Sequence, residues 1–235
     1  YMHDDGLYLI TSRALAAGRG YIIESLPSEL PQTKYPILYP AILALFWKVA
    51  GSIGPVAFIA KLLSLACTIA WLAIVRKWAA KVFENPLTVD WVLFFSACSP
   101  WVVFLSTSAL PDTFFALLST ISALMLLGDK HGNADYGWRS VAMAAALAAA
   151  AFLLRTTGIA LIAAAAIVLL KRNPRHTFLF LFVVALLSAP WLYWQALHAA
   201  PTDVIQLYYS KASYARGHIL AGYQPLQMLN VLVSN

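Results

Sequence analysis

The stretch PVAFIAKLLSLACTIAWLAIV, from Pro55 to Val75, decides the fold class of this chain. Its only charged side chain is that of Lys61. A helix that spans a bilayer needs about 20 consecutive apolar residues, and this run meets that length. Backbone polar groups find no water partners in lipid, so a single run must satisfy them internally as a helix. The stretch therefore predicts a membrane-spanning helix.

Five more apolar runs follow the first, and they extend the same interpretation to most of the chain. They cover residues 89–107, 110–127, 138–154, 156–170 and 177–197. The chain of 235 residues is 61% hydrophobic and 11% charged, whereas a soluble domain carries about 25% charged residues. We therefore predict an all-α fold, a polytopic transmembrane helical bundle. Residues 7–17 and 37–50 are apolar but short, and we expect them to be helices lying in the outer membrane interface.

The positions of the basic residues predict the orientation of the bundle. Short loops after alternate apolar runs carry Arg76, Lys77 and Lys81, then Lys130 and Arg139, then Lys171, Arg172 and Arg175. Cytoplasmic loops are enriched in Lys and Arg. The basic residues behind the net charge of +6 therefore follow the pattern of membrane orientation, and we expect no nucleic-acid partner.

This orientation divides the chain into three parts. We expect a first extracytoplasmic loop with interfacial helices over residues 1–54 and a six-helix transmembrane core over 55–197. Residues 198–235 would form another extracytoplasmic loop and begin a further helix. The absence of an initiator Met and of a preceding helix indicates a fragment of a longer protein. The expected location is the inner (plasma) membrane, crossed several times.

Asp4 and Asp5 are adjacent carboxylates at the start of the first predicted outer loop. Carboxylates are costly near lipid and are kept at a watery face, in a pocket or beside a partner. One interpretation is a helix N-cap before the apolar stretch that begins at Leu7. The other is a general base or metal ligand that acts on an acceptor hydroxyl. The local sequence leaves both open.

Two cations accompany the acidic pair on the predicted outer side. Lys34 precedes a proline-stiffened turn over residues 35–40, and it is either an interfacial lysine or a cation for a phosphate. Arg155 lies between two apolar runs, where it needs an anionic lipid head group or a carboxylate as its partner.

Other outer residues are candidates for supporting roles. Asp112 follows Pro111 and opens an apolar run, where helix capping also explains a carboxylate. Tyr8 and Tyr39 lie near the predicted interface, which favours aromatic rings. Lys211 and Arg216, among several tyrosines, suit either a lipid phosphate or sugar site or an ordinary interface belt.

Several of these stretches resemble the polytopic GT-C glycosyltransferases. Three stretches resemble the first outer loop of that superfamily, namely Asp4-Asp5-x-x-Tyr8, Gly18-x-Gly20-Tyr21 and Lys34-Tyr35-Pro36-x-Leu38-Tyr39-Pro40. Two weaker matches are Ser108-x-x-Pro111-Asp112-Thr113 and Leu154-Arg155-Thr156-Thr157-Gly158. Among its members the chain is similar to bacterial protein O-mannosyltransferases and to the lipid A aminoarabinose transferase.

The resemblance implies a reaction and roles for individual residues. A sugar would pass, with inversion, from a polyprenyl-phosphate donor to a hydroxyl of a lipid, polysaccharide or protein on the extracytoplasmic face. Asp4 would be the catalytic base or a metal ligand, with Asp5 in second place. Lys34 would contact the donor phosphate, and Arg155 is a further cation for it. No cofactor is certain, and a divalent metal held by Asp4 and Asp5 stays an open alternative.

Two other classes of function compete with the enzyme. In a transporter or lipid flippase without covalent chemistry, Arg155 and Asp112 would line a pathway. Transporters usually carry their polar groups near the bilayer midplane, whereas here these groups collect at one predicted face, which favours the enzyme. A structural membrane subunit would leave Asp4, Asp5 and Lys34 without a role.

Overall fold

The structure is a computed structural model that describes residues 3–26, 29–127 and 137–198. The first outer segment contains α1 (His3–Ala16), β1 (Ile22–Ile23), β2 (Leu30–Pro31) and α2 (Leu38–Ala50). The bundle contains α3 (Ile53–Val82), α4 (Pro86–Ala97), α5 (Pro100–Ser106), α6 (Asp112–Leu127), α7 (Trp138–Leu154), α8 (Gly158–Arg172) and α9 (Pro174–Leu197). Apart from the short antiparallel pair β1–β2, these elements are helices, and the predicted all-α membrane bundle is confirmed.

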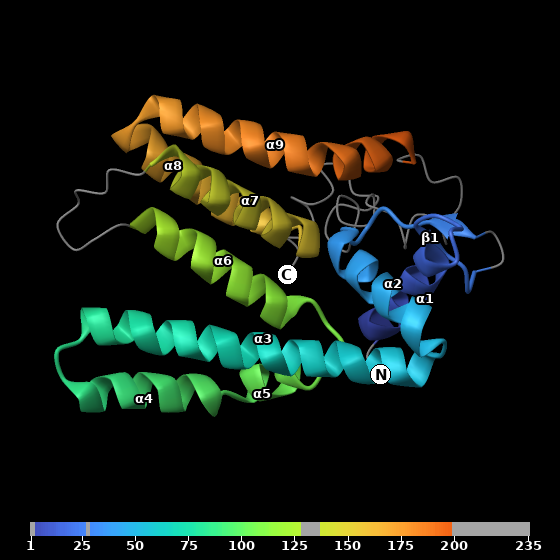
Figure 1. Cartoon of the computed structure of the whole chain (residues 1–235), viewed down its shortest axis with the longest axis horizontal. Coiled ribbons are helices and arrows are strands. Elements are labelled where there is room, and N and C mark those ends of the chain that lie inside the picture. The colour runs from blue at the N-terminus through green and yellow to red at the C-terminus, as the bar shows by residue number, and fades with distance from the viewer. Residues whose placement is uncertain (1–2, 27–28, 128–136, 199–235) are drawn as a thin grey trace, which may run out of the picture.

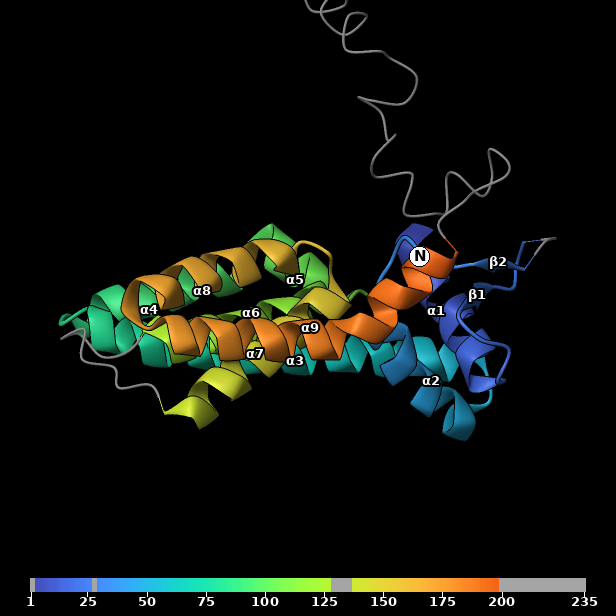
Figure 2. The same cartoon turned by 90° about the horizontal axis from the view of Figure 1, so that it is seen from above.

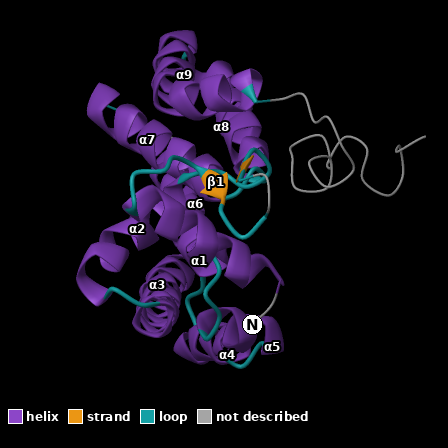
Figure 3. Ribbon diagram, turned by 90° about the vertical axis from the view of Figure 1, so that its right-hand side faces the viewer, coloured by secondary structure: helices purple, strands orange, loops and turns teal. Residues whose placement is uncertain are grey.

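The described helices form an elongated bundle with a cap packed on one end. In Figures 1 and 2, α3 to α9 run roughly along the long axis, and α1, α2 and β1 lie together at one end, where α3 runs alongside α1 and α2. Figure 3 views that end directly and shows β1 and α1 in front of the bundle. The end of α9 reaches the same cap, which places a late segment beside the first outer segment.

Helix α7 occupies the centre of the larger apolar cluster, between α6 and α9. Its inward face consists of small residues, and Ala144, Ala145, Ala148 and Ala149 are fully buried. Small side chains let helix backbones approach closely in membranes. One interhelical hydrogen bond follows from this approach, because the Ser122 hydroxyl of α6 donates to the Ala144 carbonyl oxygen at 2.8 Å.

Among the described helices, two are long and apolar enough by themselves to cross a membrane, namely α3 with 30 residues and α9 with 24. The pair α4 and α5 meets the same test only together, and it bends by 59° at the break. The expected single helix over 89–107 is therefore wrong. Pro100 starts a new helix, and the residue before a proline avoids helical geometry, as extended Ser99 does here.

The three remaining bundle helices, α6 to α8, are shorter than a full span, with 16, 17 and 15 residues. The division into six crossings remains a prediction.

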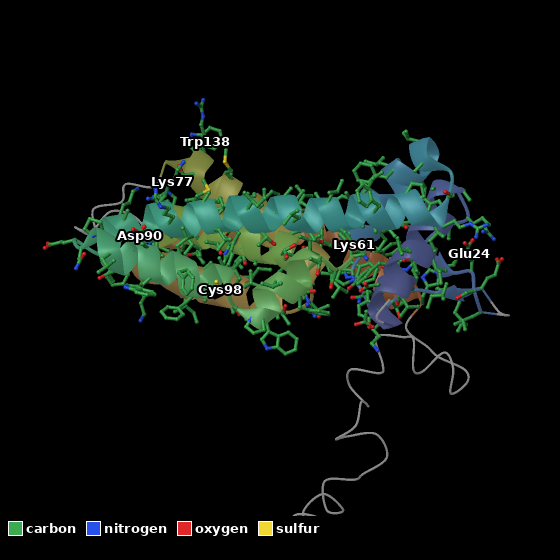
Figure 4. The ribbon with its side chains drawn as sticks, turned by 90° about the horizontal axis from the view of Figure 1, so that it is seen from below. Glu24, Lys61, Lys77, Asp90, Cys98 and Trp138 are labelled. Atoms are coloured by element: carbon green, nitrogen blue, oxygen red, sulfur yellow. The ribbon has the colours of Figure 1, made fainter. Side chains whose placement is uncertain are left out.

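The turns that join the described helices lie at two opposite ends of the bundle. Figure 4 labels Lys77 and Asp90 near one end of the molecule and Glu24 near the other. The turns before α6 and before α8 lie toward the end that carries α1 and α2 (Figure 1). Asp4, Asp112 and Arg155 therefore belong to the same end of the bundle.

Candidate active site

The acidic pair lies inside the first turn of α1, which begins at His3. The expected helix began at residue 7 with an aspartate as its cap, so that interpretation is wrong for both residues. The N-terminal turn of a helix carries a partial positive charge that favours carboxylates. Asp4 is partly exposed, whereas Asp5 is only 4% exposed. The two neighbours thus meet different surroundings.

Asp4 is held by Tyr35, a residue 31 positions later in the chain. The Tyr35 hydroxyl donates a hydrogen bond of 2.8 Å to Asp4 Oδ1. The Lys34 ammonium lies over the same tyrosine ring, 5.5 Å from its centre, in the range of a cation–π interaction. One side chain therefore contacts both the candidate base and the candidate phosphate-binding lysine.

Asp5 is buried against the turn between α5 and α6. Burial raises the pKa of its carboxyl group above the ordinary value of 3.8, and a hydrogen bond from the Ala109 backbone and the charge of Lys61 partly oppose that rise. Lys61 comes from α3 (Figure 4). Within the described part of the chain, Asp5 Oδ1 is buried without a hydrogen-bond partner. A buried polar atom without a hydrogen-bond partner lowers the free energy of unfolding.

The rings of Tyr8 and Tyr39 belong to an aromatic cluster with Tyr35, the hydrogen-bond partner of Asp4. Tyr8 lies one helical turn after Asp4, and its ring centre is 5.2 Å from that of Tyr35 and 5.3 Å from that of Tyr39. Burial raises the pKa of the Tyr8 phenol well above its ordinary value, and the charge of Arg155 works against this. Burial also raises the pKa of Tyr39. Both phenols therefore stay neutral at physiological pH.

Arg155 forms an ion pair with Asp112. Arg155 directly follows the last residue of α7, and Asp112 is the first residue of α6. Of the two partners expected for the arginine, a carboxylate is the one present. Arg155 keeps 40% of its side chain exposed, and its charge reaches Tyr8. The Asp4 carboxylate acts in the opposite sense and raises the pKa of that phenol.

The end of α9 fixes the segment that carries Lys34. The Trp194 indole N–H donates to the Gln32 carbonyl oxygen at 3.0 Å, and the Gln195 amide donates to the Thr33 carbonyl oxygen at 2.8 Å. The Tyr21 hydroxyl in turn donates to the Tyr35 carbonyl oxygen at 3.0 Å. Backbone groups on both sides of Lys34 are thus anchored, and its ammonium group is presented from a fixed turn.

A sequence model of the Alg9-like mannosyltransferase family matches residues 33–220. The chain belongs to this family. The matched region contains Lys34, Asp112 and Arg155, and it starts after the acidic pair. Searches of curated proteins and of solved structures each found no match.

Family membership and the apolar helices together establish the general activity. The protein is a multi-pass membrane glycosyltransferase that moves a sugar from a donor to an acceptor, and its resemblance to GT-C enzymes is confirmed. The expected enzyme class, transferase, is therefore correct.

Several residues of this candidate site have no local sequence signal for their contacts. Tyr35 belongs to a recognised motif, but its position predicts an interface ring and not a bond to Asp4. Gln32 and Thr33 meet α9 residues that lie 162 positions away. Such contacts arise from packing of the whole bundle. A search for aromatic residues flanking the lysine could have singled out Tyr35 alone.

The two predicted supporting cations and the possible metal site remain. Lys211 and Arg216 lie outside the described residues. Among the residues that the structure describes, no group of three or more His, Cys, Asp and Glu side chains could hold a metal ion.

Proposed function

We propose that this protein transfers a sugar, in keeping with its family a mannosyl residue, from a polyprenyl-phosphate donor to an acceptor hydroxyl. The reaction would take place on the extracytoplasmic face of the inner membrane. The observation that supports this most is the double contact of Tyr35, which brings the partly exposed Asp4 and Lys34 to one place. A base beside a phosphate-binding cation is what transfer from a sugar phosphate requires.

In the proposed reaction Asp4 is the general base. It accepts the proton of the acceptor hydroxyl while that oxygen forms a bond to the anomeric carbon. The bond between the anomeric carbon and the phosphate oxygen breaks on the opposite side, and polyprenyl phosphate leaves with the bonding electron pair. The transfer therefore inverts the configuration of the sugar. The Tyr35 hydroxyl keeps the Asp4 carboxylate in position for this step.

Lys34 and Arg155 are the proposed cations for the donor phosphate. Negative charge grows on the leaving phosphate, and preorganised cations stabilise it. The Lys34 turn is anchored to α9, and Arg155 is oriented by Asp112, so neither group needs to be ordered when the donor binds. Both lie at the end of the bundle where a lipid-linked donor can keep its chain in the bilayer.

The proposal gives Asp5 a supporting part beside Asp4 in the reaction, and the tyrosines a structural part. Asp5 joins α1 to the turn at Ala109, and the Tyr8 ring packs against the rings of Tyr35 and Tyr39. The acceptor hydroxyl belongs to a lipid, a polysaccharide or a protein, and these alternatives share the same chemistry at Asp4.

Transfer from a labelled donor tests the proposal. Membranes containing the protein are given polyprenyl-phosphate mannose with a radiolabelled sugar, and labelled products are separated from the donor. We expect product formation, and Lys34→Ala and Arg155→Ala should each raise the donor KM about tenfold or more, because each removes a charged contact worth about 1.5–3 kcal/mol.

Lys48→Ala is the matched control, since Lys48 is an exposed lysine of α2 outside the site. Its donor KM should equal that of the unaltered protein. The proposal is contradicted if no labelled product forms, or if both variants keep the original donor KM. Movement of the donor across vesicles without any product would indicate a transporter.

A further inference from the structure

A second candidate site lies beside the second half of α1, further along the helix than the acidic pair. A cavity of about 290 Å³ opens between α1, the segment after β1 and the junction of α2 with α3. Its lining contains Leu9, Ile10, Arg13, Glu24, Trp47, Gly51, Ser52 and Ile53. Small-molecule sites commonly measure about 300–1,000 Å³, so this cavity has room for one small ligand.

The cavity is separate from the proposed active site. Arg13 follows Asp4 by nine residues, which is about two and a half helical turns and about 13 Å along α1. An odd half turn puts the two side chains on opposite faces of the helix. Glu24 also lines this cavity, and its ion-pair partners are Arg13 and Arg19 and not the acidic pair. A ligand here would not occupy the position of the reacting sugar.

The charges around the cavity cancel. Arg13 Nε lies 3.3 Å from Glu24 Oε1, and Arg19 pairs with Glu24 and, at 3.5 Å, with Glu29. Two arginines thus balance two glutamates. An anion would meet the Glu24 carboxylate in the lining, and a cation would meet Arg13. A neutral ligand that both donates and accepts hydrogen bonds suits such a pair of groups, as hydroxyl groups do.

The rest of the lining is apolar and includes an aromatic ring. The Trp47 indole N–H already donates to the Ser12 hydroxyl at 2.8 Å, so Trp47 offers the cavity its ring and no donor. Leu9, Ile10 and Ile53 extend this apolar surface. A hexose has an apolar face of C–H groups and a rim of hydroxyls, which matches an apolar wall beside a neutral Arg–Glu pair.

We infer that this cavity binds a neutral hexose residue of a glycan, at a site distinct from the acidic pair. In a glycosyltransferase, such a site would hold a sugar of the acceptor or product glycan away from the reacting hydroxyl. This role rests on the proposed function, whereas the binding of a sugar does not.

Ligand-observed NMR tests the inference without any need for activity. Saturation-transfer difference spectra are recorded for the protein in nanodiscs with methyl α-mannoside, methyl α-glucoside and methyl α-galactoside, each as a neutral probe. We expect a signal from at least one glycoside. Ile10→Phe, which fills the cavity, should abolish it. Arg13→Ala should weaken binding about tenfold by removing hydrogen bonds from a charged donor.

Two matched controls keep the result specific. Val49→Phe adds the same kind of bulk to an exposed side chain outside the lining, and Lys48→Ala removes a charge outside it. Both should bind the glycoside as the unaltered protein does. The inference is wrong if none of the three glycosides gives a signal that Ile10→Phe removes. Binding of inorganic phosphate that depends on Arg13, in place of glycoside binding, would also overturn it.

Because these spectra require no turnover, their outcome is independent of the transfer assay. A protein that transfers sugar but shows no glycoside signal would contradict this inference alone. A protein that binds the glycoside but forms no product from polyprenyl-phosphate mannose would contradict only the proposed function and the acceptor role.

Discussion

At the scale of single residues, Asp5 combines burial with an incomplete set of hydrogen bonds. Its Oδ1 atom has no partner among the described residues, and an unpaired buried polar atom costs about 1–3 kcal/mol. Sites that act on substrates often retain such costs, and relieving them raises stability at the expense of activity. Asp5→Asn removes the charge at nearly constant size.

We predict that Asp5→Asn unfolds at a temperature at least as high as the unaltered protein at pH 7, by up to a few degrees, while sugar transfer is lost. Thermal unfolding in detergent and the transfer assay provide the two measurements. An Asp5→Asn protein that transfers sugar normally would leave Asp5 without a functional part.

The same substitution has a defined pH dependence. The pKa of Asp5 is raised in the folded protein by burial, so folding favours the protonated carboxyl. Below the ordinary pKa of 3.8, Asp5 is protonated in both the folded and the unfolded protein, and its contribution to stability is complete. As the pH rises through the raised pKa of the folded protein, Asp5 becomes charged in its buried position and this contribution is lost. The advantage of Asp5→Asn should therefore grow from pH 4 upward. An advantage that shrinks over this range would have the wrong sign.

Tyr35 is the second residue on which the site depends. Tyr35→Phe removes the hydroxyl that donates to Asp4 but keeps the ring that lies beside Lys34 and Tyr8. A hydrogen bond to a charged group is worth about 1.5–3 kcal/mol, so kcat should fall about tenfold or more. The donor KM should change little, because the lysine contact remains. Steady-state kinetics would contradict the prediction if kcat stayed the same while the KM rose.

At the scale of elements, the turn between α7 and α8 requires a glycine. A Cβ atom added at Gly158 would lie 2.7 Å from the backbone of Phe152, closer than real side chains approach. We predict that Gly158→Ala lowers the free energy of unfolding by about 1–3 kcal/mol, the usual range for overpacking. Gly54→Ala is the control, since a Cβ there meets no described heavy atom within 4 Å. Equal thermal stability of the two variants would contradict this account of the turn.

The end of α9 acts as an anchor for the Lys34 turn. Gln195→Met keeps the size of the buried side chain and removes the amide that donates to the Thr33 carbonyl oxygen. We predict a several-fold rise in the donor KM with a smaller change in kcat, because the turn loses order before the donor binds. Tyr193→Phe, at an exposed neighbouring position, should leave the donor KM unchanged. A Gln195→Met protein with normal donor kinetics would remove α9 from the site.

Hydropathy predicts the elements of this fold well where the signal is local. The runs at 55–75 and 177–197 became α3 and α9 because length and apolar content alone decide a spanning helix. The break at Ser99–Pro100 was also visible in the sequence, since proline begins helices and seldom continues them. The early start of α1 was not visible, because Asp4 and Asp5 suit both a cap and a first turn.

At the scale of the whole molecule, the site could be predicted only in part. The sequence indicated that Asp4, Lys34 and Arg155 share one end of the bundle, since charge patterns and loop alternation are read directly. It could not predict that Tyr35 joins two of them or that Asp112 holds the third. The Tyr35–Asp4 contact joins residues that are 31 positions apart, and the Arg155–Asp112 contact joins residues that are 43 positions apart. Both contacts exist only after α1, α6 and α7 pack together.

The central claim is that these separate elements meet to form one centre for sugar transfer, with Asp4 as its base. The most direct test is transfer of labelled mannose from its polyprenyl-phosphate donor by membranes that contain equal amounts of the unaltered protein and of Asp4→Asn. Asparagine keeps the shape of the side chain but accepts a proton poorly. Since general-base catalysis contributes about 10²–10⁴-fold to a rate, the rate of transfer by Asp4→Asn should fall at least a hundredfold. Its insertion into the membrane should be normal. An Asp4→Asn protein that transfers mannose at the original rate would contradict it.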